Sequence, residues 1–396
     1  MSLEPATLWR CIIATTGPSQ RVCYIDREGE LEGALASHLS EAFYAIDTEF
    51  ISGKFYDTRL ALVQLGWPDE ILLIDPLKVD LAPLTVLFEG TGTALLHAAA
   101  SDLEIMEDAI GLRPSAIFDT QLAAQILGWP TPSLKVLAGS VLGITLDKTK
   151  QYSDWLERPL PEASLTYAAS DVAYLHAIES FLSGKLADAG RSAWAKEEFD
   201  AMLERSSSPL DSEELWWRIS RVGALKADRQ LIVQRLAMYR DEQARARNRP
   251  SSHILRDEAI VAIATRPPNS PRALKSIKGL SSLPDNAARE IVEVIHAALA
   301  ADPHELRALP ENPFNLELEP VLNVLAALAR QRAMDLEIDT DLLARRRDLT
   351  AYLSGSPNRL TQGWRRDCIL EDVELLRSGK AQITLADDRV RLLSAE

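Results

Sequence analysis

The segment that most limits how this chain can fold is residues 43–50, which read Phe-Tyr-Ala-Ile-Asp-Thr-Glu-Phe. The apolar run is typical of a buried strand, and it ends in two carboxylates, Asp47 and Glu49. Side chains two apart on a strand project from the same face, so these carboxylates converge. Hard cations such as Mg2+ prefer carboxylate oxygens as ligands. The pattern therefore fits part of a metal site or, alternatively, the solvated rim of a strand.

Three further acidic residues follow in blocks that favour the metal site. Asp102 lies in Leu-Leu-His-Ala-Ala-Ala-Ser-Asp-Leu, and Asp119 lies in Phe-Asp-Thr-Gln. Asp171 follows Tyr167 by four residues, so on a helix the two side chains lie one turn apart on the same side. Taken alone, that pair also fits an ordinary surface pair. Asp102 alone also fits a helix-start residue, with Ser101 as the cap of that helix.

The composition is that of a globular protein, with 396 residues, 46% of them hydrophobic. This length predicts two or three domains, because one core usually organises roughly 100–200 residues. The three scattered cysteines, Cys11, Cys23 and Cys368, exclude a disulfide framework, and no structural zinc is expected. The N-terminal residues show no export pattern and no apolar run reaches membrane-spanning length, so we expect a cytoplasmic protein with no membrane contact.

The net charge of -15 is unevenly distributed along the chain. Residues 1–200 hold 14 Lys and Arg against 29 Asp and Glu, residues 201–300 hold 16 against 12, and residues 301–396 hold 13 against 17. Affinity for nucleic acid comes mainly from Lys and Arg. The acidic first segment therefore fits metal ligands, whereas the positive middle segment fits a nucleic-acid partner.

The middle segment carries many of its cations in a series interleaved with Trp216, Trp217 and Tyr239. This series fits either a solvated helix face or an RNA-binding surface. It comprises Arg218, Arg221, Lys226, Arg229, Arg235, Arg240, Arg245, Arg247 and Arg249.

Hydrophobic patterning predicts an α/β first domain. Three short strands within residues 43–74 are joined by short turns, which favours an antiparallel meander. A helix near residues 81–88 and a buried strand near residues 94–98 come next. Further helices follow, and one of them, over residues 161–182, presents an apolar face.

Two breaks divide the rest of the chain. Arg-Ser-Ser-Ser-Pro-Leu at residues 205–210 marks a linker, and the prolines at residues 310–313 mark a second boundary. The sequence beyond the linker is almost entirely helical in pattern up to Ala381. We therefore predict three domains, at residues 1–205, 210–300 and 301–396.

The acidic blocks and Tyr167, in this order and spacing, resemble the DEDD superfamily of 3'–5' exonucleases in its tyrosine-bearing branch. Blocks such as Asp-Trp-Leu-Glu-Arg-Pro-Leu at residues 154–160 look specifically like the ribonuclease D family, over roughly residues 25–200. Residues 210–300 are similar to the helicase-and-ribonuclease-D C-terminal (HRDC) domain, and residues 301–396 look like a diverged second copy.

This resemblance implies a ribonuclease H-like mixed sheet in the exonuclease domain, followed by two all-helical HRDC-type domains. It also implies the roles of the site residues. Asp47, Glu49, Asp102 and Asp171 would bind two divalent cations, Mg2+ or Mn2+, and Tyr167 would orient the attacking water.

Other residues near the acidic blocks are given lesser roles. We interpret Asp119 as a helix-start or supporting residue and His97 as a packed core residue. Contacts to the substrate are expected from residues beside the first two acids and from cations between the later blocks, although these cations also fit ordinary surface charge. These candidates are Thr48, Phe50, Lys135, Lys148 and Arg158.

The resemblance implies a metal-dependent 3'–5' exoribonuclease that trims RNA with a free 3' end and releases nucleoside 5'-monophosphates. Precursors of tRNA are the expected substrate, and a monomer is expected. Two alternatives remain: a 3'–5' DNA exonuclease on the same fold, and a non-catalytic RNA-binding protein that uses the fold as a scaffold. The lack of polymerase or helicase motifs favours RNA, and the complete set of acids favours an enzyme.

Overall fold

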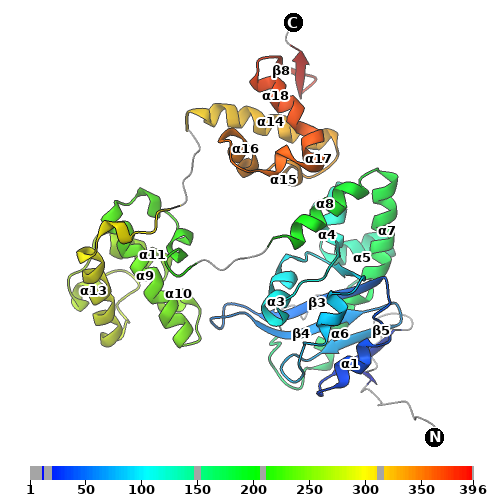
Figure 1. The fold of residues 1–396 in the computed structure, drawn as a ribbon, viewed down its shortest axis with the longest axis horizontal. Helices are drawn as coiled ribbons and strands as arrows, with labels where there is room; N and C mark the ends of the chain where they lie inside the picture. The colour runs from blue at the N-terminus through cyan, green and yellow to red at the C-terminus, as the bar shows by residue number, and fades with distance from the viewer. Residues whose placement is uncertain (1–10, 13–19, 147–152, 206–210, 310–315, 395–396) are drawn as a thin grey trace. The chain divides into compact units, whose positions relative to one another are not determined.

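The structure, a computed structural model, describes residues 11–12, 20–146, 153–205, 211–309 and 316–394 (Figure 1). The chain divides into two compact units. One unit comprises Met1–Phe50, Leu60–Ser206 and Pro313–Glu396. The other comprises Ile51–Arg59 and Ser207–Asn312.

A seven-stranded mixed sheet forms the centre of the first unit, in the order β1-β2-β5-β4-β3-β6-β7. The pairs β2–β5, β3–β6 and β6–β7 are parallel, and β1–β2 and β4–β5 are antiparallel. The strands are β1 (Cys11–Ile12), β2 (Arg21–Ile25), β3 (Phe43–Ile51), β4 (Arg59–Gly66), β5 (Glu70–Ile74), β6 (Thr93–Leu96) and β7 (Ile117–Asp119). The strands predicted within residues 43–74 are thus sheet neighbours, and β5 is buried along its whole length.

Eight helices of the first unit precede residue 206 among the described residues. They are α1 (Glu30–Leu35), α2 (Leu84–Phe88), α3 (Ala100–Ile110), α4 (Thr120–Ile126), α5 (Leu134–Leu142), α6 (Glu162–Ala173), α7 (Leu175–Asp188) and α8 (Ser192–Leu203). The prediction of a single helix over residues 161–182 is wrong in one respect. The structure has two helices there, α6 and α7, and they are separated at Tyr174, where φ is -112° and ψ is -2°. The break ends α6 shortly after Asp171.

The second unit is helical. Its elements are η1 (Leu215–Arg218), η2 (Val222–Ala224), α9 (Ala227–Ala246), α10 (Ser251–Ile254), α11 (Asp257–Thr265), α12 (Pro271–Lys275), α13 (Asp285–Ala300) and η3 (Pro303–Glu305). Its core includes the fully buried Trp216, Ile232, Leu236 and Ile260. This arrangement confirms the helical middle segment, and one of its predicted aromatics, Trp216, is a core residue.

The last segment joins the first unit through α8. Arg365 forms a buried ion pair with Glu198, and the Trp364 ring stacks on Trp194 with centroids 4.6 Å apart. Its elements are η4 (Leu316–Leu318), α14 (Glu319–Asp335), α15 (Thr340–Leu343), α16 (Arg346–Leu353), η5 (Arg359–Thr361), α17 (Gly363–Arg365), η6 (Arg366–Leu370), α18 (Glu371–Arg377), β8 (Ala381–Ala386) and β9 (Arg389–Ser394). The all-helical prediction is wrong here, because β8 and β9 form an antiparallel hairpin.

No helix in the described part of the chain combines the length and apolar character that a membrane span requires.

Candidate metal centre and active site

Strand β3, an inner strand of the sheet, carries Asp47 and Glu49 in its carboxyl-terminal half. Tyr44, Ala45 and Ile46 are almost completely buried and fix the strand beside β6, with Ala45 opposite Leu95. The alternation of the strand then brings the side chains of Asp47 and Glu49 to one face. Because β3, β6 and β7 run parallel, their carboxyl ends meet at one edge of the sheet, where open α/β sheets place their ligands.

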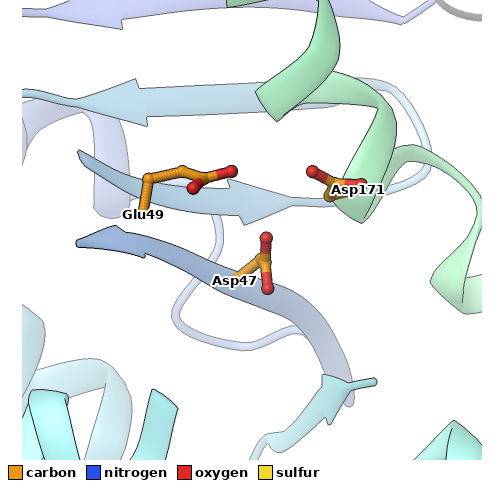
Figure 2. A group of neighbouring side chains, drawn as sticks. All are labelled: Asp47, Glu49 and Asp171. Atoms are coloured by element: carbon orange, nitrogen blue, oxygen red, sulfur yellow. The ribbon is translucent and has the colours of Figure 1, made fainter. Parts of the chain in front are cut away.

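Asp171 completes a group of three carboxylates with Asp47 and Glu49. One oxygen from each of the three lies within 4.8 Å of the others. Figure 2 shows Asp171 reaching from its helix toward the two side chains of β3. Hard oxygen donors at this spacing suit a divalent cation such as Mg2+ or Mn2+.

Helix α6 also positions Tyr167. The helix packs through Leu165, Ala168 and Val172, which are buried, and leaves Tyr167 and Asp171 on its other side. The Asp171 carboxylate lies one helical turn from the Tyr167 ring, close enough to influence the hydroxyl. Burial first, and then the charges of Asp171 and its neighbours, raise the pKa of Tyr167, so the phenol keeps its proton at neutral pH.

Asp102 stands outside the group of three. It lies in the first turn of α3, is 7% exposed, and accepts a 2.5 Å hydrogen bond from the Thr48 hydroxyl. The predicted Ser101 cap is wrong, because α3 begins at Ala100 after an Ala99 cap position with no side-chain cap. The Asp102 carboxylate is thus tied to β3 through Thr48, the residue between Asp47 and Glu49.

Asp119 supplies the support that the start of α3 lacks. Its carboxylate accepts hydrogen bonds from the backbone N–H groups of Ala98 and Ala99, at 3.1 and 2.9 Å. The same carboxylate caps α4 by accepting from the N–H groups of Gln121 and Leu122. The predicted helix-start role is confirmed, and Asp119 also fixes the backbone that leads to Asp102.

Burial and mutual repulsion both disfavour the ionised forms of the carboxylates in the site. Burial, followed by the charges of Asp102, Asp171 and Glu49, raises the pKa of Asp47 well above its usual value. Burial and the neighbouring carboxylates raise the pKa of Glu49 to about 9, and burial raises the pKa of Asp102 to about 6. A bound cation would restore the ionised forms, because its positive charge offsets this repulsion.

A cavity of about 350 Å³ opens beside these groups. Asp47, Glu49, Tyr167 and Asp171 line it, together with His97, Gln121, Ser133 and Lys135. The prediction left Gln121 and Ser133 without a role, although Gln121 lies in the block Phe-Asp-Thr-Gln that it noted. His97 Nδ1 lies 3.0 Å from the Thr120 hydroxyl, so this residue lines the cavity while being held by α4.

The five residues expected to contact the substrate have different environments in the structure. Lys135 lines the cavity, Phe50 is half-buried in β3, and Thr48 is engaged with Asp102. The Arg158 guanidinium forms a bidentate ion pair with Asp75, at 2.6 and 2.7 Å, and also donates to the Ala61 carbonyl. This geometry argues against the predicted Arg158 contact. Lys148 lies outside the described residues.

Comparison with known proteins finds two protein families along the chain. Residues 22–187 match the family described as 3'-5' exonuclease, and residues 229–295 match the HRDC domain. Ribonuclease D of Bartonella henselae is 31% identical over 386 residues, which covers 95% of both chains. Ribonuclease D of Zymomonas mobilis is 32% identical over 375 residues and covers 92% of this chain and 96% of its own.

A solved structure extends the similarity to the fold. Escherichia coli RNase D, described as an exoribonuclease involved in structured RNA processing, superposes with a TM-score of 0.83 at 26% identity. The match covers 92% of this chain and 100% of that one. Fold and acidic centre define the chain as a metal-dependent 3'–5' exonuclease. It belongs to the ribonuclease D family of 3'–5' exoribonucleases.

Proposed function

We propose that this chain trims RNA 3' ends one nucleotide at a time with two divalent cations, Mg2+ or Mn2+, and releases nucleoside 5'-monophosphates. The observation that carries the proposal is the convergence of Asp47, Glu49 and Asp171 beside Tyr167 in an open cavity. When bound, such cations would activate water and offset the charge on the leaving 3'-oxygen. Asp47, Glu49 and Asp171 would hold them together with Asp102, which lies beside this group.

Tyr167 acts in this scheme as a donor and not as a base. Its raised pKa keeps the hydroxyl protonated beside the Asp171 carboxylate. Trp155 restrains the ring, because its ring centroid lies 6.1 Å from that of Tyr167. A fixed hydroxyl beside the scissile phosphate would orient the attacking water, and such positioning lowers the barrier without a change in charge.

The expected substrate is a structured RNA with a free 3' end, and we propose tRNA precursors. The similarity to Escherichia coli RNase D, whose description names structured RNA processing, supports a structured substrate. An HRDC domain attached to the exonuclease fits the same role, because it adds a second surface for RNA. We propose further that the protein works in the cytoplasm, as a monomer, and without structural zinc.

We also propose the domain limits 1–205, 210–300 and 301–396, with the last as a diverged HRDC-like domain. The helices α14 to α18 support this assignment, and the β8–β9 hairpin would be an addition to it.

Labelled RNA tests the proposal directly. An RNA labelled at its 5' end should shorten in single-nucleotide steps, and the same RNA labelled at its 3' end should release labelled 5'-monophosphate at once. Chelation or Asp47→Ala should abolish both signals. Internal fragments, or hydrolysis by Asp47→Ala at the wild-type rate with Mg2+ present, would overturn the proposal.

Two further measurements settle its finer points. Crystals soaked in Mn2+ should show two anomalous peaks at the carboxylate group, and a single peak would exclude the two-cation scheme. Matched single-stranded RNA and DNA should differ in kcat/KM in favour of RNA, and a preference for DNA would select the DNA exonuclease.

A further inference from the structure

The cavity beside the metal centre has a second group of lining residues that the cations do not need. Its acids and Tyr167 come from β3 and α6, whereas Gln121, Ser133, Leu134 and Lys135 come from the start of α4 and the start of α5. Cavities of a few hundred Å³ hold one small molecule, so this cavity, at about 350 Å³, suits a single nucleotide of the substrate.

Gln121 is held through both its backbone and its side chain. Its backbone N–H donates to the Asp119 carboxylate at 2.8 Å, and its side-chain Nε2 donates to the Pro132 carbonyl at 3.1 Å. A carbonyl oxygen can only accept, so the amide nitrogen of Gln121 must face Pro132 and the amide oxygen is the end that remains. No described residue donates to that oxygen. Gln121 therefore brings a fixed hydrogen-bond acceptor to the cavity.

Ser133 follows Pro132 directly and brings the complementary donor. It occupies the N-cap position of α5, where a serine hydroxyl usually accepts from the first backbone N–H groups of the helix. Here the side chain makes no cap hydrogen bond, and the residue lines the cavity instead. Because the Pro132 carbonyl anchors Gln121, the amide acceptor and the serine hydroxyl are presented from neighbouring positions.

The acceptor on Gln121 limits which part of a nucleotide it can meet. Phosphate oxygens accept hydrogen bonds and donate none, so an amide oxygen cannot bind them. Base edges differ from one nucleotide to the next, and an enzyme that removes nucleotides one at a time has to accept each of them. The ribose hydroxyls remain, because a hydroxyl can donate one hydrogen bond and accept another.

Of the two hydroxyls at an RNA 3' end, only the 2'-hydroxyl distinguishes RNA from DNA. The other lining groups have no such selectivity, because the acids suit cations, Lys135 suits a phosphate and the leucines suit any base or sugar face. His97 is tied through Nδ1 to the Thr120 hydroxyl. Gln121 and Ser133 are therefore the lining residues best suited to a 2'-hydroxyl.

We propose that Gln121 and Ser133 select RNA over DNA by binding the 2'-hydroxyl of the 3'-terminal nucleotide. That hydroxyl donates to Oε1 of Gln121 and accepts from Oγ of Ser133. This inference rests on the proposed function and deepens it, since it assigns the preference for RNA to two named side chains. A deoxyribose leaves both groups without a partner, and sites built to bind a hydroxyl discriminate against analogues that lack it.

The test uses three variants of the full chain. Gln121→Leu removes the acceptor, and Ser133→Ala removes the donor. Gln125→Leu is the matched control, because Gln125 lies one turn further along α4 and donates to the Thr131 hydroxyl at 3.0 Å without lining the cavity. The melting temperatures of the two glutamine variants should agree, since each variant loses one hydrogen bond to the segment before α5.

The substrates are RNA oligonucleotides that differ only in the last nucleotide, which is ribo, 2'-deoxy or 3'-deoxy. In the wild-type chain and in Gln125→Leu, kcat/KM for removal of the ribo end should exceed that for the 2'-deoxy end by about 10- to 100-fold. This ratio should fall close to 1 in Gln121→Leu and part of the way in Ser133→Ala.

Three results of these assays would overturn the proposal. They are a wild-type ratio near 1, an unchanged ratio in both cavity variants, and an equal loss on the ribo and 2'-deoxy ends, which would indicate a structural role. A discrimination that followed the 3'-deoxy end instead would assign Gln121 and Ser133 to the 3'-hydroxyl and would also overturn it.

Binding of mononucleotides separates this proposal from the proposed function. With Mn2+ present, titration calorimetry should show that the wild-type chain binds adenosine 5'-monophosphate about tenfold more tightly than its 2'-deoxy analogue, whereas Gln121→Leu binds the two alike. Equal affinities in the wild-type chain would overturn the 2'-hydroxyl contact. A wild-type chain that hydrolysed neither RNA nor DNA would instead remove the proposed function, while calorimetry would still decide the role of Gln121.

Discussion

Two carboxylate sites in the exonuclease domain have pKa values that are shifted in opposite directions. Asp75 is fully buried, and burial alone would raise its pKa, but hydrogen bonds from Arg158 and Tyr24 lower that pKa below its usual value. Asp47 meets other carboxylates instead, and its pKa rises well above the usual value. The two sites differ in whether the protein itself supplies the compensating charge.

This difference separates a structural charge from a functional one. The Asp75–Arg158 pair links the end of β5 to the segment before α6, so its charges are used within the fold. The Asp47 group concentrates negative charge beside a cavity, which costs stability unless a cation binds. Substitutions at the two sites should therefore have opposite consequences.

The largest effect is expected for Asp47→Asn. Loss of a cation ligand should lower kcat by about 10³-fold or more, because metal-ion stabilisation is worth several kcal/mol and each 1.36 kcal/mol is tenfold. Thermal stability of the metal-free protein should stay equal or rise, since a repelled charge is removed. Activity on short RNA and melting curves measure both, with the exposed Asp69→Asn as the control. A variant that loses stability but keeps its activity would reverse the comparison.

The next largest effect is expected for Arg158→Met. Removing one partner of a buried pair should cost about 3 kcal/mol of unfolding free energy, because Asp75 is left buried and unpaired. The double variant Asp75→Asn/Arg158→Met should lose less than the two single variants combined, as urea unfolding would show. If Arg158→Met were fully stable and instead raised KM for RNA, the predicted substrate contact would be restored.

A smaller effect, confined to turnover, is expected for Tyr167→Phe. The substitution removes the hydroxyl and keeps the ring beside Trp155. Loss of a group that orients the water should lower kcat by about 10²-fold while KM changes by less than about twofold. Steady-state kinetics on short RNA separate the two parameters, and a change in KM alone would contradict the orienting role.

The smallest effect is a dependence of stability on acid. The pKa of Asp75 is lowered in the folded chain, so its contribution to stability is complete above the unfolded value, about 3.9, and is lost as pH falls through the folded pKa. The stability difference between wild type and Asp75→Asn should therefore shrink below about pH 4. A difference that grew in acid would give the pKa shift the wrong sign.

Local patterns in the sequence predicted the parts of the site that depend on local geometry. Asp47 and Glu49 share a face because strands alternate, and Tyr167 and Asp171 share a face because helices repeat near every four residues. Because β3, β6 and β7 run parallel, their carboxyl ends lie together at one end of the sheet, and the residues that follow β6 and β7 come close to Asp47 and Glu49 on β3.

Contacts between distant residues could not be predicted in the same way. Arg158 reaches Asp75 across 83 positions, and nothing in its own segment distinguishes it from a surface cation. The β8–β9 hairpin escaped detection because its strands are mostly exposed and its turn, at Asp387 and Asp388, lacks the glycine that usually marks positive φ. The break at Tyr174 likewise interrupts a continuous apolar pattern.

The carboxylate of Asp119 holds two helix starts at once, and this has a consequence for mutagenesis. An alanine scan scored by activity alone would place Asp119 among the essential acids, because its loss frees the backbone ahead of Asp102. A metal titration would separate Asp119 from the acids that bind the cations. Excess Mn2+ should recover part of the activity of an Asp119 variant, in which a cation ligand is only displaced. It should recover little of the activity of a variant that lacks a cation ligand altogether. The four carboxylates proposed to bind cations and the one that anchors the backbone would then be distinguished by how activity depends on the Mn2+ concentration.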